Sequence, residues 1–277
     1  MVKIQKHLPA LIYGTAWKKE KTAELIEKAI LYGFRGIDTA CQPKHYHEAG
    51  VGQALIRLKA HGILRESLYI QTKFTPLAGQ DLASVPYDPH APLKDQVYQS
   101  FQASLKNLGV TYVEALLLHS PLARHEETME VWQAMEKLQM EGSVYQLGIS
   151  NCYELPAFKS FYSEAHIKPS ILQNRFYAQN DYDKILRSFC IQENIYYQSF
   201  WTLTANQNLL KTAILSNLAL KKNISVEQIF FRYLTELNII PLIGTCSERH
   251  MKKDLAIFDI HLTTDEMEQI NTIFNHV

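Results

Sequence analysis

The stretch Gly33-Phe34-Arg35-Gly36-Ile37-Asp38-Thr39-Ala40 places a carboxylate at the end of an apparent strand, and the phenol of Tyr46 follows a few residues later. Two later strand-like segments also end on a polar residue, Lys73 in one and His119 in the other. A lysine or a histidine is costly at the inner end of an apolar strand unless something there uses it. We therefore expect an acid, a phenol, an amine and an imidazole to converge at one end of the fold, in a site that donates a proton.

Short apolar segments alternate with longer amphipathic segments along the whole chain. This alternation predicts an α/β fold, a (β/α)8 TIM barrel, formed as a single domain over residues 1–277. An open doubly wound sheet is the alternative, but the GxGxxG turn expected after its first strand is absent. The predicted strands are 8–14, 35–38, 68–73, 113–119, 144–149, 170–174, 195–200 and 238–243. The predicted helices are 22–32 (capped by Thr22), 48–59, 96–108, 126–140, 154–161, 182–193, 207–220, 226–235, 248–257 and 264–275.

Charge balance and cysteine spacing limit the class of protein. The 277 residues include 28 basic and 28 acidic side chains, so nothing indicates nucleic acid or an anionic membrane as a partner. The four cysteines show no CxxC spacing, which is typical of reduced thiols rather than a zinc site or a disulfide framework. Residues 1–9 lack a hydrophobic signal core, and no apolar run approaches the ~20 residues that span a bilayer. We expect a soluble, cytoplasmic protein.

Several separated motifs follow one another in an order that resembles the aldo-keto reductases over nearly the whole chain. They are Gly-Thr-Ala-Trp at 14–17, the stretch 33–40, Val-Gly-Gln-Ala-Leu at 51–55, Leu-His-Ser-Pro at 118–121 and Leu-Gly-Ile-Ser-Asn at 147–151. The resemblance implies an oxidoreductase that uses a nicotinamide cofactor and no metal to reduce the carbonyl group of a small aldehyde or ketone. It also implies a catalytic tetrad of Asp38, Tyr46, Lys73 and His119.

Elementary chemistry supports these roles. A free phenol has a pKa of about 10 and therefore retains a proton to donate at neutral pH. We expect Lys73 to stabilise the phenolate of Tyr46 and lower its pKa, and Asp38 to orient Lys73. A neutral His119 would hold the substrate oxygen. Taken singly, each residue also has an ordinary structural interpretation, such as a turn cap for Asp38 or a lysine that snorkels to solvent.

The spacing between Asp38 and Tyr46 is longer than the family pattern, because residues 41–48 contain a small insertion. An alternative alignment, counted backward from Val51, places His45 at the position of the proton donor. We prefer Tyr46, because a phenol beside a lysine suits a donor at neutral pH.

A second group of residues is implied to hold the nicotinamide end of the cofactor. Ser150 and Asn151 leave the fifth strand together, and Gln173 would complete a donor and acceptor set for the carboxamide. Phe200, with Trp201 second, would stack on the nicotinamide ring, although core packing is the alternative for Phe200. The further cofactor residues predicted are Thr15, Ala16, Asp38 and Leu203.

At the phosphate end, the lysine that many relatives carry after the last strand is missing, and Gly244-Thr245 stands there instead. Backbone amides of such a turn can still bind phosphate. Arg249 and His250, with Lys252 and Lys253, are candidates for a 2′-phosphate, or only a solvated helix face. We favour NADPH over NADH as the cofactor.

Substrate identity is less determined. Residues 74–92, which hold four prolines, follow the third strand as a long loop, on the face where barrel active sites occur. Trp17, Phe74 and Tyr87 are the predicted substrate contacts. Many relatives close the pocket with a long tail, whereas this chain stops at Val277, so a more open pocket is expected.

Two other functions compete. A metal-dependent hydrolase would use the His45-x-His47 pair, but neighbouring histidines share a face only on an extended strand. A regulatory protein could retain the fold and the cofactor but catalyse little, since fold does not guarantee activity.

Overall fold

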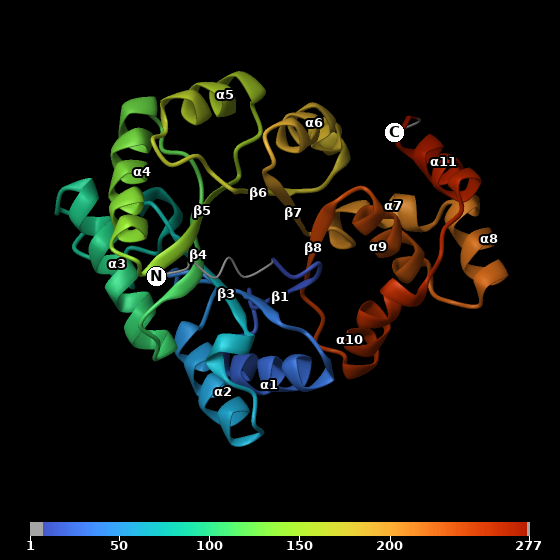
Figure 1. The fold of residues 1–277 in the computed structure, drawn as a ribbon, viewed down its shortest axis with the longest axis horizontal. Coiled ribbons are helices and arrows are strands. Elements are labelled where there is room, and N and C mark those ends of the chain that lie inside the picture. The colour runs from blue at the N-terminus through green and yellow to red at the C-terminus, as the bar shows by residue number, and fades with distance from the viewer. Residues whose placement is uncertain (1–7, 276–277) are drawn as a thin grey trace.

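Eight parallel strands pair in chain order and close into a barrel in the computed structural model, which describes residues 8–275 (Figure 1). The first seven residues, most of the stretch expected to lack a signal core, lie outside the description, as do the last two. The ring closes where Ile12 pairs with Leu242. The strands are β1 Ile12–Gly14, β2 Gly36–Asp38, β3 Tyr69–Phe74, β4 Val113–Leu118, β5 Val144–Ser150, β6 Ile171–Arg175, β7 Tyr196–Phe200 and β8 Ile239–Ile243.

The predicted (β/α)8 barrel is therefore confirmed, and the predicted strands differ from the observed ones by only a residue or two, with one exception. The first strand begins at Ile12 instead of residue 8. Pro9 lies within the missing part, and a proline has no N–H to donate to a strand ladder.

Helices surround the strands as an outer layer (Figure 1). They are α1 Thr22–Tyr32, α2 Glu48–Ala60, α3 Leu93–Leu108, α4 His125–Met140, α5 Leu155–Glu164, α6 Lys184–Gln192, α7 Gln207–Leu210, α8 Ala213–Lys222, α9 Val226–Glu236, α10 Glu248–Leu255 and α11 Thr264–Thr272.

Two details of the predicted helices are wrong. The helix expected over 207–220 is split, because Thr212 is extended and its hydroxyl donates to the carbonyl of Leu209 at 2.8 Å, in competition with the helix. Thr22 does not cap α1 either. A 3-10 turn runs directly into the helix, and the Thr22 hydroxyl donates to the carbonyl of Lys19 at 2.6 Å.

The inside of the barrel carries polar side chains at mid-height. Alternate residues of a strand point to the same side, so Gln71, Gln173 and Gln198 face inward with Asp38. Gln198 accepts hydrogen bonds from Gln71 and Gln173, both at 2.8 Å, and Gln71 also donates to Asp38 at 2.7 Å. This buried network links four strands and fixes the floor of the barrel mouth.

The apolar core lies mainly between the strands and the helices. Trp132 of α4 is fully buried there, and its indole N–H donates to the carbonyl of Ile167 at 3.0 Å. Helix α2 approaches α3 closely at Gly52, where a Cβ atom would lie 2.3 Å from the carbonyl oxygen of Asn107. Only glycine therefore permits this contact between the two helices.

The loop between β3 and α3 is irregular as predicted, apart from a 3-10 turn at Leu77–Gly79.

All four cysteines are free, and Cys246 alone is exposed. Burial raises the pKa of the Cys41 and Cys152 thiols to about 12.

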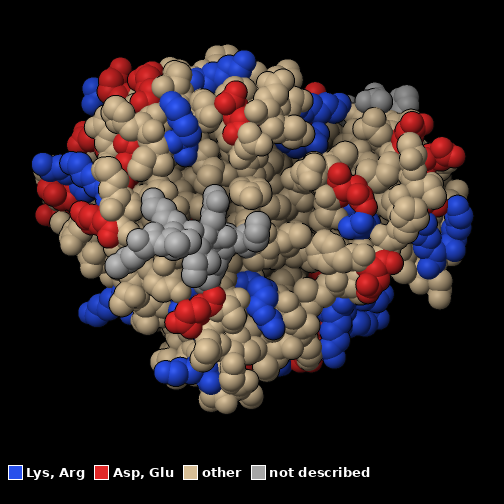
Figure 2. All heavy atoms as spheres, viewed as in Figure 1, with Lys and Arg blue, Asp and Glu red and all other residues tan. Residues whose placement is uncertain are grey.

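Positive and negative side chains are interspersed on the face drawn in Figure 2. Within residues 8–275, no helix combines the length and the apolar character needed to cross a bilayer.

Candidate active site

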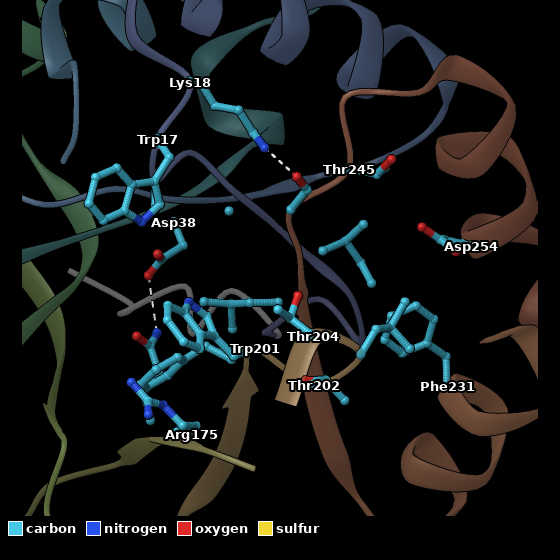
Figure 3. Close-up of a pocket in the computed structure, with 18 of the residues that line it drawn as sticks. Trp17, Lys18, Asp38, Arg175, Trp201, Thr202, Thr204, Phe231, Thr245 and Asp254 are labelled. Atoms are coloured by element: carbon cyan, nitrogen blue, oxygen red, sulfur yellow. Dashed lines mark hydrogen bonds between the residues drawn. The ribbon is translucent and has the colours of Figure 1, made fainter. Parts of the chain in front are cut away.

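A cavity of about 800 Å³ opens at the carboxyl ends of the strands. Trp17 and Asp38 lie toward one end, and Phe231 and Asp254 lie toward the other (Figure 3). Most of the residues predicted for the site line this cavity, although they come from all parts of the chain. They are Ala16, Trp17, Asp38, Tyr46, His119, Ser150, Asn151, Gln173, Phe200, Trp201, Leu203, Gly244, Thr245, Arg249 and His250.

Asp38 and Lys73 form an ion pair at the base of the cavity. The ammonium of Lys73 donates to both carboxylate oxygens of Asp38, at 2.6 and 2.7 Å, and to the carbonyl of Thr39 at 2.9 Å. Both side chains are almost fully buried, and burial lowers the pKa of Lys73 from its ordinary value, although Asp38 opposes this effect. The lysine is therefore held by a carboxylate and does not snorkel to solvent.

The ring of Tyr46 lies over this pair. Lys73 Nζ is 5.1 Å from the centre of the Tyr46 ring, and the ring of His119 packs edge-on against Tyr46 at 5.9 Å. His45 instead packs on Trp17, with ring centres 4.0 Å apart, and its Nδ1 contacts Gln42. The structure thus brings Tyr46, rather than His45, to the lysine.

The expectation that Lys73 lowers the pKa of Tyr46 is wrong. Burial, together with the negative charge of Asp38, raises the pKa of Tyr46 far above its ordinary value. Lys73 cannot reverse this effect, because its charge is balanced by the carboxylate to which it is bound. The phenol accordingly keeps its proton at neutral pH.

His119 is held neutral by its surroundings. Burial, and then the positive charge of Lys73, lowers the pKa of His119 well below its ordinary value. Its Nδ1 lies 2.6 Å from the hydroxyl oxygen of Thr75, which leaves Nε2 for the cavity. Thr75, just beyond the end of β3, is a residue that the sequence argument missed, although it comes only two positions after Lys73.

The amide residues at the exits of β5 and β6 differ in their free hydrogen-bonding capacity. The Nδ2 group of Asn151 donates to the carbonyl of His119, and its Oδ1 accepts from Tyr153, so this side chain is engaged within the protein. Gln173 donates to Asp38 and Gln198 through Nε2, which leaves its Oε1 as an available acceptor. The hydroxyl of Ser150 accepts from Asn151 at 3.3 Å and retains its proton for donation.

At the other end of the cavity, the side chain of Lys18 lies beside the turn at Gly244, where many relatives carry a lysine that this chain lacks. The ammonium of Lys18 donates to the carbonyl of Gly244 (Figure 3). A side chain at position 244 would begin 4.0 Å from that nitrogen. The sequence argument missed Lys18, although it directly follows the Gly14–Trp17 motif and β1 pairs with β8. Arg249, His250 and Lys253 line the same end, whereas Lys252 turns away and lies over the Tyr32 ring at 4.4 Å.

Five predicted residues do not line the cavity: Lys73, bound beneath it to Asp38, and Lys252, packed on Tyr32, together with Thr15, Phe74 and Tyr87. Thr15 is buried, and its hydroxyl donates to the backbone carbonyl of Asp38 at 2.8 Å. Phe74 and Tyr87 pack against each other in the core, and Tyr87 donates to the carbonyl of Thr75. The loop between β3 and α3 therefore folds back onto the barrel and fixes Thr75, instead of presenting its aromatic rings to a ligand.

The two histidines of the metal alternative bind different partners. His45 Nδ1 contacts Gln42, and His47 Nδ1 lies 3.2 Å from the carbonyl of Lys19. Over residues 8–275, no group of three His, Cys, Asp or Glu side chains is arranged to hold a metal ion.

Comparison with known proteins shows the family of this chain. The model of the aldo/keto reductase family matches residues 10–275. The uncharacterized oxidoreductase YtbE of Bacillus subtilis is 30% identical over 258 residues, which cover 92% of this chain and 85% of that protein. Glyoxal reductase of the same organism is 26% identical, with 91% of this chain and 83% of the relative covered.

Solved structures show the same fold. An aldo/keto reductase from Brucella melitensis superposes with a TM-score of 0.82 at 27% identity, covering 97% of this chain and 96% of that one. A Bombyx mori aldo-keto reductase in complex with NADP gives a TM-score of 0.79 at 25% identity, with 96% and 89% covered. The chain belongs to the aldo/keto reductase family and is an NAD(P)H-dependent oxidoreductase.

The contact between Thr75 and His119 yields a first prediction. If the Thr75 hydroxyl donates to Nδ1, neutral His119 carries its proton on Nε2, and histidine 15N chemical shifts should show that tautomer. Thr75→Val removes the donor, so we expect a mixture of tautomers, while Thr75→Ser should preserve the Nε2–H form. An unchanged tautomer in Thr75→Val would refute the assignment.

Asp254 yields a second prediction. Burial, and then the carboxylate of Glu227, raises the pKa of Asp254 to about 7, so its protonated form stabilises the fold at low pH and this stability is lost as pH rises through 7. Asp254→Asn cannot ionise. We expect it to raise the free energy of unfolding at pH 8 by on the order of 2 kcal/mol, with the gain vanishing near pH 4. Chemical denaturation without cofactor measures both values, and an equal gain at the two pH values would contradict this explanation.

Proposed function

We propose that this protein reduces an aldehyde or ketone to the alcohol with NADPH, and that Tyr46 donates the proton. The observation that carries the proposal is the convergence of a protonated phenol, a neutral imidazole and a buried lysine–carboxylate pair at one end of a long cavity. The cofactor, when bound, supplies a hydride to the carbonyl carbon.

The residues at the nicotinamide end fit a primary carboxamide. Such a group needs one hydrogen-bond donor for its oxygen and acceptors for its NH2 group. The Ser150 hydroxyl can serve as the donor and Gln173 Oε1 as the acceptor, since neither capacity is used within the protein. Phe200 lines the adjacent wall and offers a flat face for the ring.

Tyr46 is suited to give a proton to the carbonyl oxygen as negative charge develops on it. The high pKa keeps the phenol protonated until the oxygen becomes basic enough to accept the proton. His119 would donate a hydrogen bond from Nε2 to the same oxygen and so orient it. Lys73, 5.1 Å from the Tyr46 ring centre, would offset part of the negative charge of the phenolate that remains, although Asp38 and burial still keep the pKa of Tyr46 above its ordinary value.

The opposite end of the cavity fits a phosphorylated dinucleotide. Lys18, bound to the carbonyl of Gly244, brings positive charge to the turn before α10, where the helix begins after Ser247. Arg249, His250 and Lys253 add charge that would favour the 2′-phosphate of NADPH. The relative from Bombyx mori, solved with NADP, supports the same choice.

The proton donor is tested by Tyr46→Phe. Without the hydroxyl, carbonyl reduction should fall by at least about 100-fold, while NADPH still binds, because the hydroxyl acts only on the substrate oxygen. Aldehyde-dependent oxidation of NADPH measures the rate, and quenching of tryptophan fluorescence measures the binding. Tyr98→Phe, at an exposed tyrosine of α3, is the matched control and should leave both the rate and the NADPH binding unchanged. Near-normal turnover of Tyr46→Phe would exclude this donor, and NADPH binding without turnover of any aldehyde by the unmodified protein would favour the regulatory alternative.

The proposed binding of the 2′-phosphate is tested by Arg249→Ala. Loss of a cation beside the 2′-phosphate should weaken NADPH binding about 10-fold, or about 1.4 kcal/mol, and change NADH binding much less. Lys252→Ala is the control, because that side chain packs on Tyr32 outside the cavity. Equal loss for the two cofactors, or tighter binding of NADH by the unmodified protein, would rule out a 2′-phosphate site here.

A further inference from the structure

The guanidinium of Arg175 lines the cavity but has no part in the reaction described above. Arg175 ends β6, two residues after Gln173, so its side chain points to the same, inner side of the barrel. It pairs in register with Phe200, and its backbone N–H donates to Tyr153, which in turn donates to Asn151. Arg175 therefore belongs to the nicotinamide end of the cavity, away from the cluster that contains Arg249.

Aromatic faces hold this guanidinium in place. Its central carbon lies 4.3 Å from the ring centre of Trp201 and 5.2 Å from that of Tyr177. Figure 3 shows Arg175 near Trp201, at one side of the group of cavity-lining residues. Trp201 has a φ of 54°, in the left-handed region that an aromatic residue seldom adopts. Backbone strain of this kind is typical of functional sites, and here it sets the ring that supports the cation.

The charge of Arg175 is not neutralised by the protein. No carboxylate within residues 8–275 forms an ion pair with it, and its Nε is buried with no hydrogen-bond partner. A partly desolvated guanidinium without a neighbouring anion is energetically unfavourable. A ligand that carries an anionic group would therefore bind more tightly than a neutral one. The fixed fork of an arginine suits the two oxygens of a carboxylate or a phosphate.

We propose that Arg175 selects carbonyl substrates that also carry an oxyanion, either a carboxylate or a phosphate. This inference rests on the proposed function, since it assigns the substrate class of the same site. Because Trp201 and Tyr177 already order the side chain, little conformational entropy is lost when the anion binds.

Binding measurements test this assignment without relying on turnover. With NADP⁺ present, when no reduction can occur, calorimetry compares 4-carboxybenzaldehyde with its methyl ester, and glyceraldehyde 3-phosphate with glyceraldehyde. We expect at least one anionic member to bind about 10-fold more tightly than its neutral partner, and the preferred pair identifies the oxyanion. Arg175→Met should abolish that preference. The same substitution at an exposed arginine that does not line the cavity, Arg124→Met, should retain it.

Three results would overturn the proposal. The first is equal binding of the neutral and anionic members of both pairs. The second is a preference that survives in Arg175→Met. A fall in NADP⁺ affinity in Arg175→Met that matches the fall in affinity for the anionic aldehyde would instead assign the guanidinium to the cofactor, and would also overturn it. Failure of the proposed function is distinct, because it would appear as absence of NADPH oxidation with every aldehyde, whatever their relative affinities.

Discussion

The ion pair between Lys73 and Asp38 is the contact on which the rest of the site depends. Each charge is almost fully buried, and removal of either partner would leave the other uncompensated, at a cost of roughly 3–5 kcal/mol. The two residues lie on neighbouring strands, and the glutamine network below them fixes the carboxylate by a 2.7 Å bond from Gln71. Closure of the barrel therefore builds the base of the site, and Tyr46 and His119 pack upon it.

A neutral ion pair explains the protonation of its neighbours. Because the charges of Lys73 and Asp38 largely cancel, burial dominates the pKa of Tyr46 and raises it, while burial and the lysine lower the pKa of His119. Both groups consequently face the cavity in their uncharged forms. This arrangement favours an oxygen that acquires negative charge only in the transition state, since donors already in position need little reorganisation.

Each of the two ends of the cavity has its own positively charged side chains. At one end, Lys18 reaches from the loop after β1 to the carbonyl of Gly244, and thus replaces charge that the turn after β8 lacks. At the other, Arg175 lies between the rings of Tyr177 and Trp201, beside the end proposed to hold the nicotinamide. The loop after β3 serves a different purpose from the one its position suggested. Tyr87 donates to Thr75, and Thr75 contacts His119, so this loop supports the imidazole from behind.

The sequence by itself determined the barrel, because strand and helix periodicities are local properties, and it determined most of the cavity-lining set, because polar residues that end parallel strands must meet at one edge. Only the tertiary structure decided which side chains face the cavity. Phe74 was assigned to the substrate but packs in the core, since strand alternation turns it away from Lys73. Lys18 and Arg175 were missed, since their environments come from strands and loops distant in the chain. The direction of the Tyr46 pKa was also beyond the sequence, because it follows from burial and from a charge balance between residues 38 and 73 that exists only once the barrel is closed.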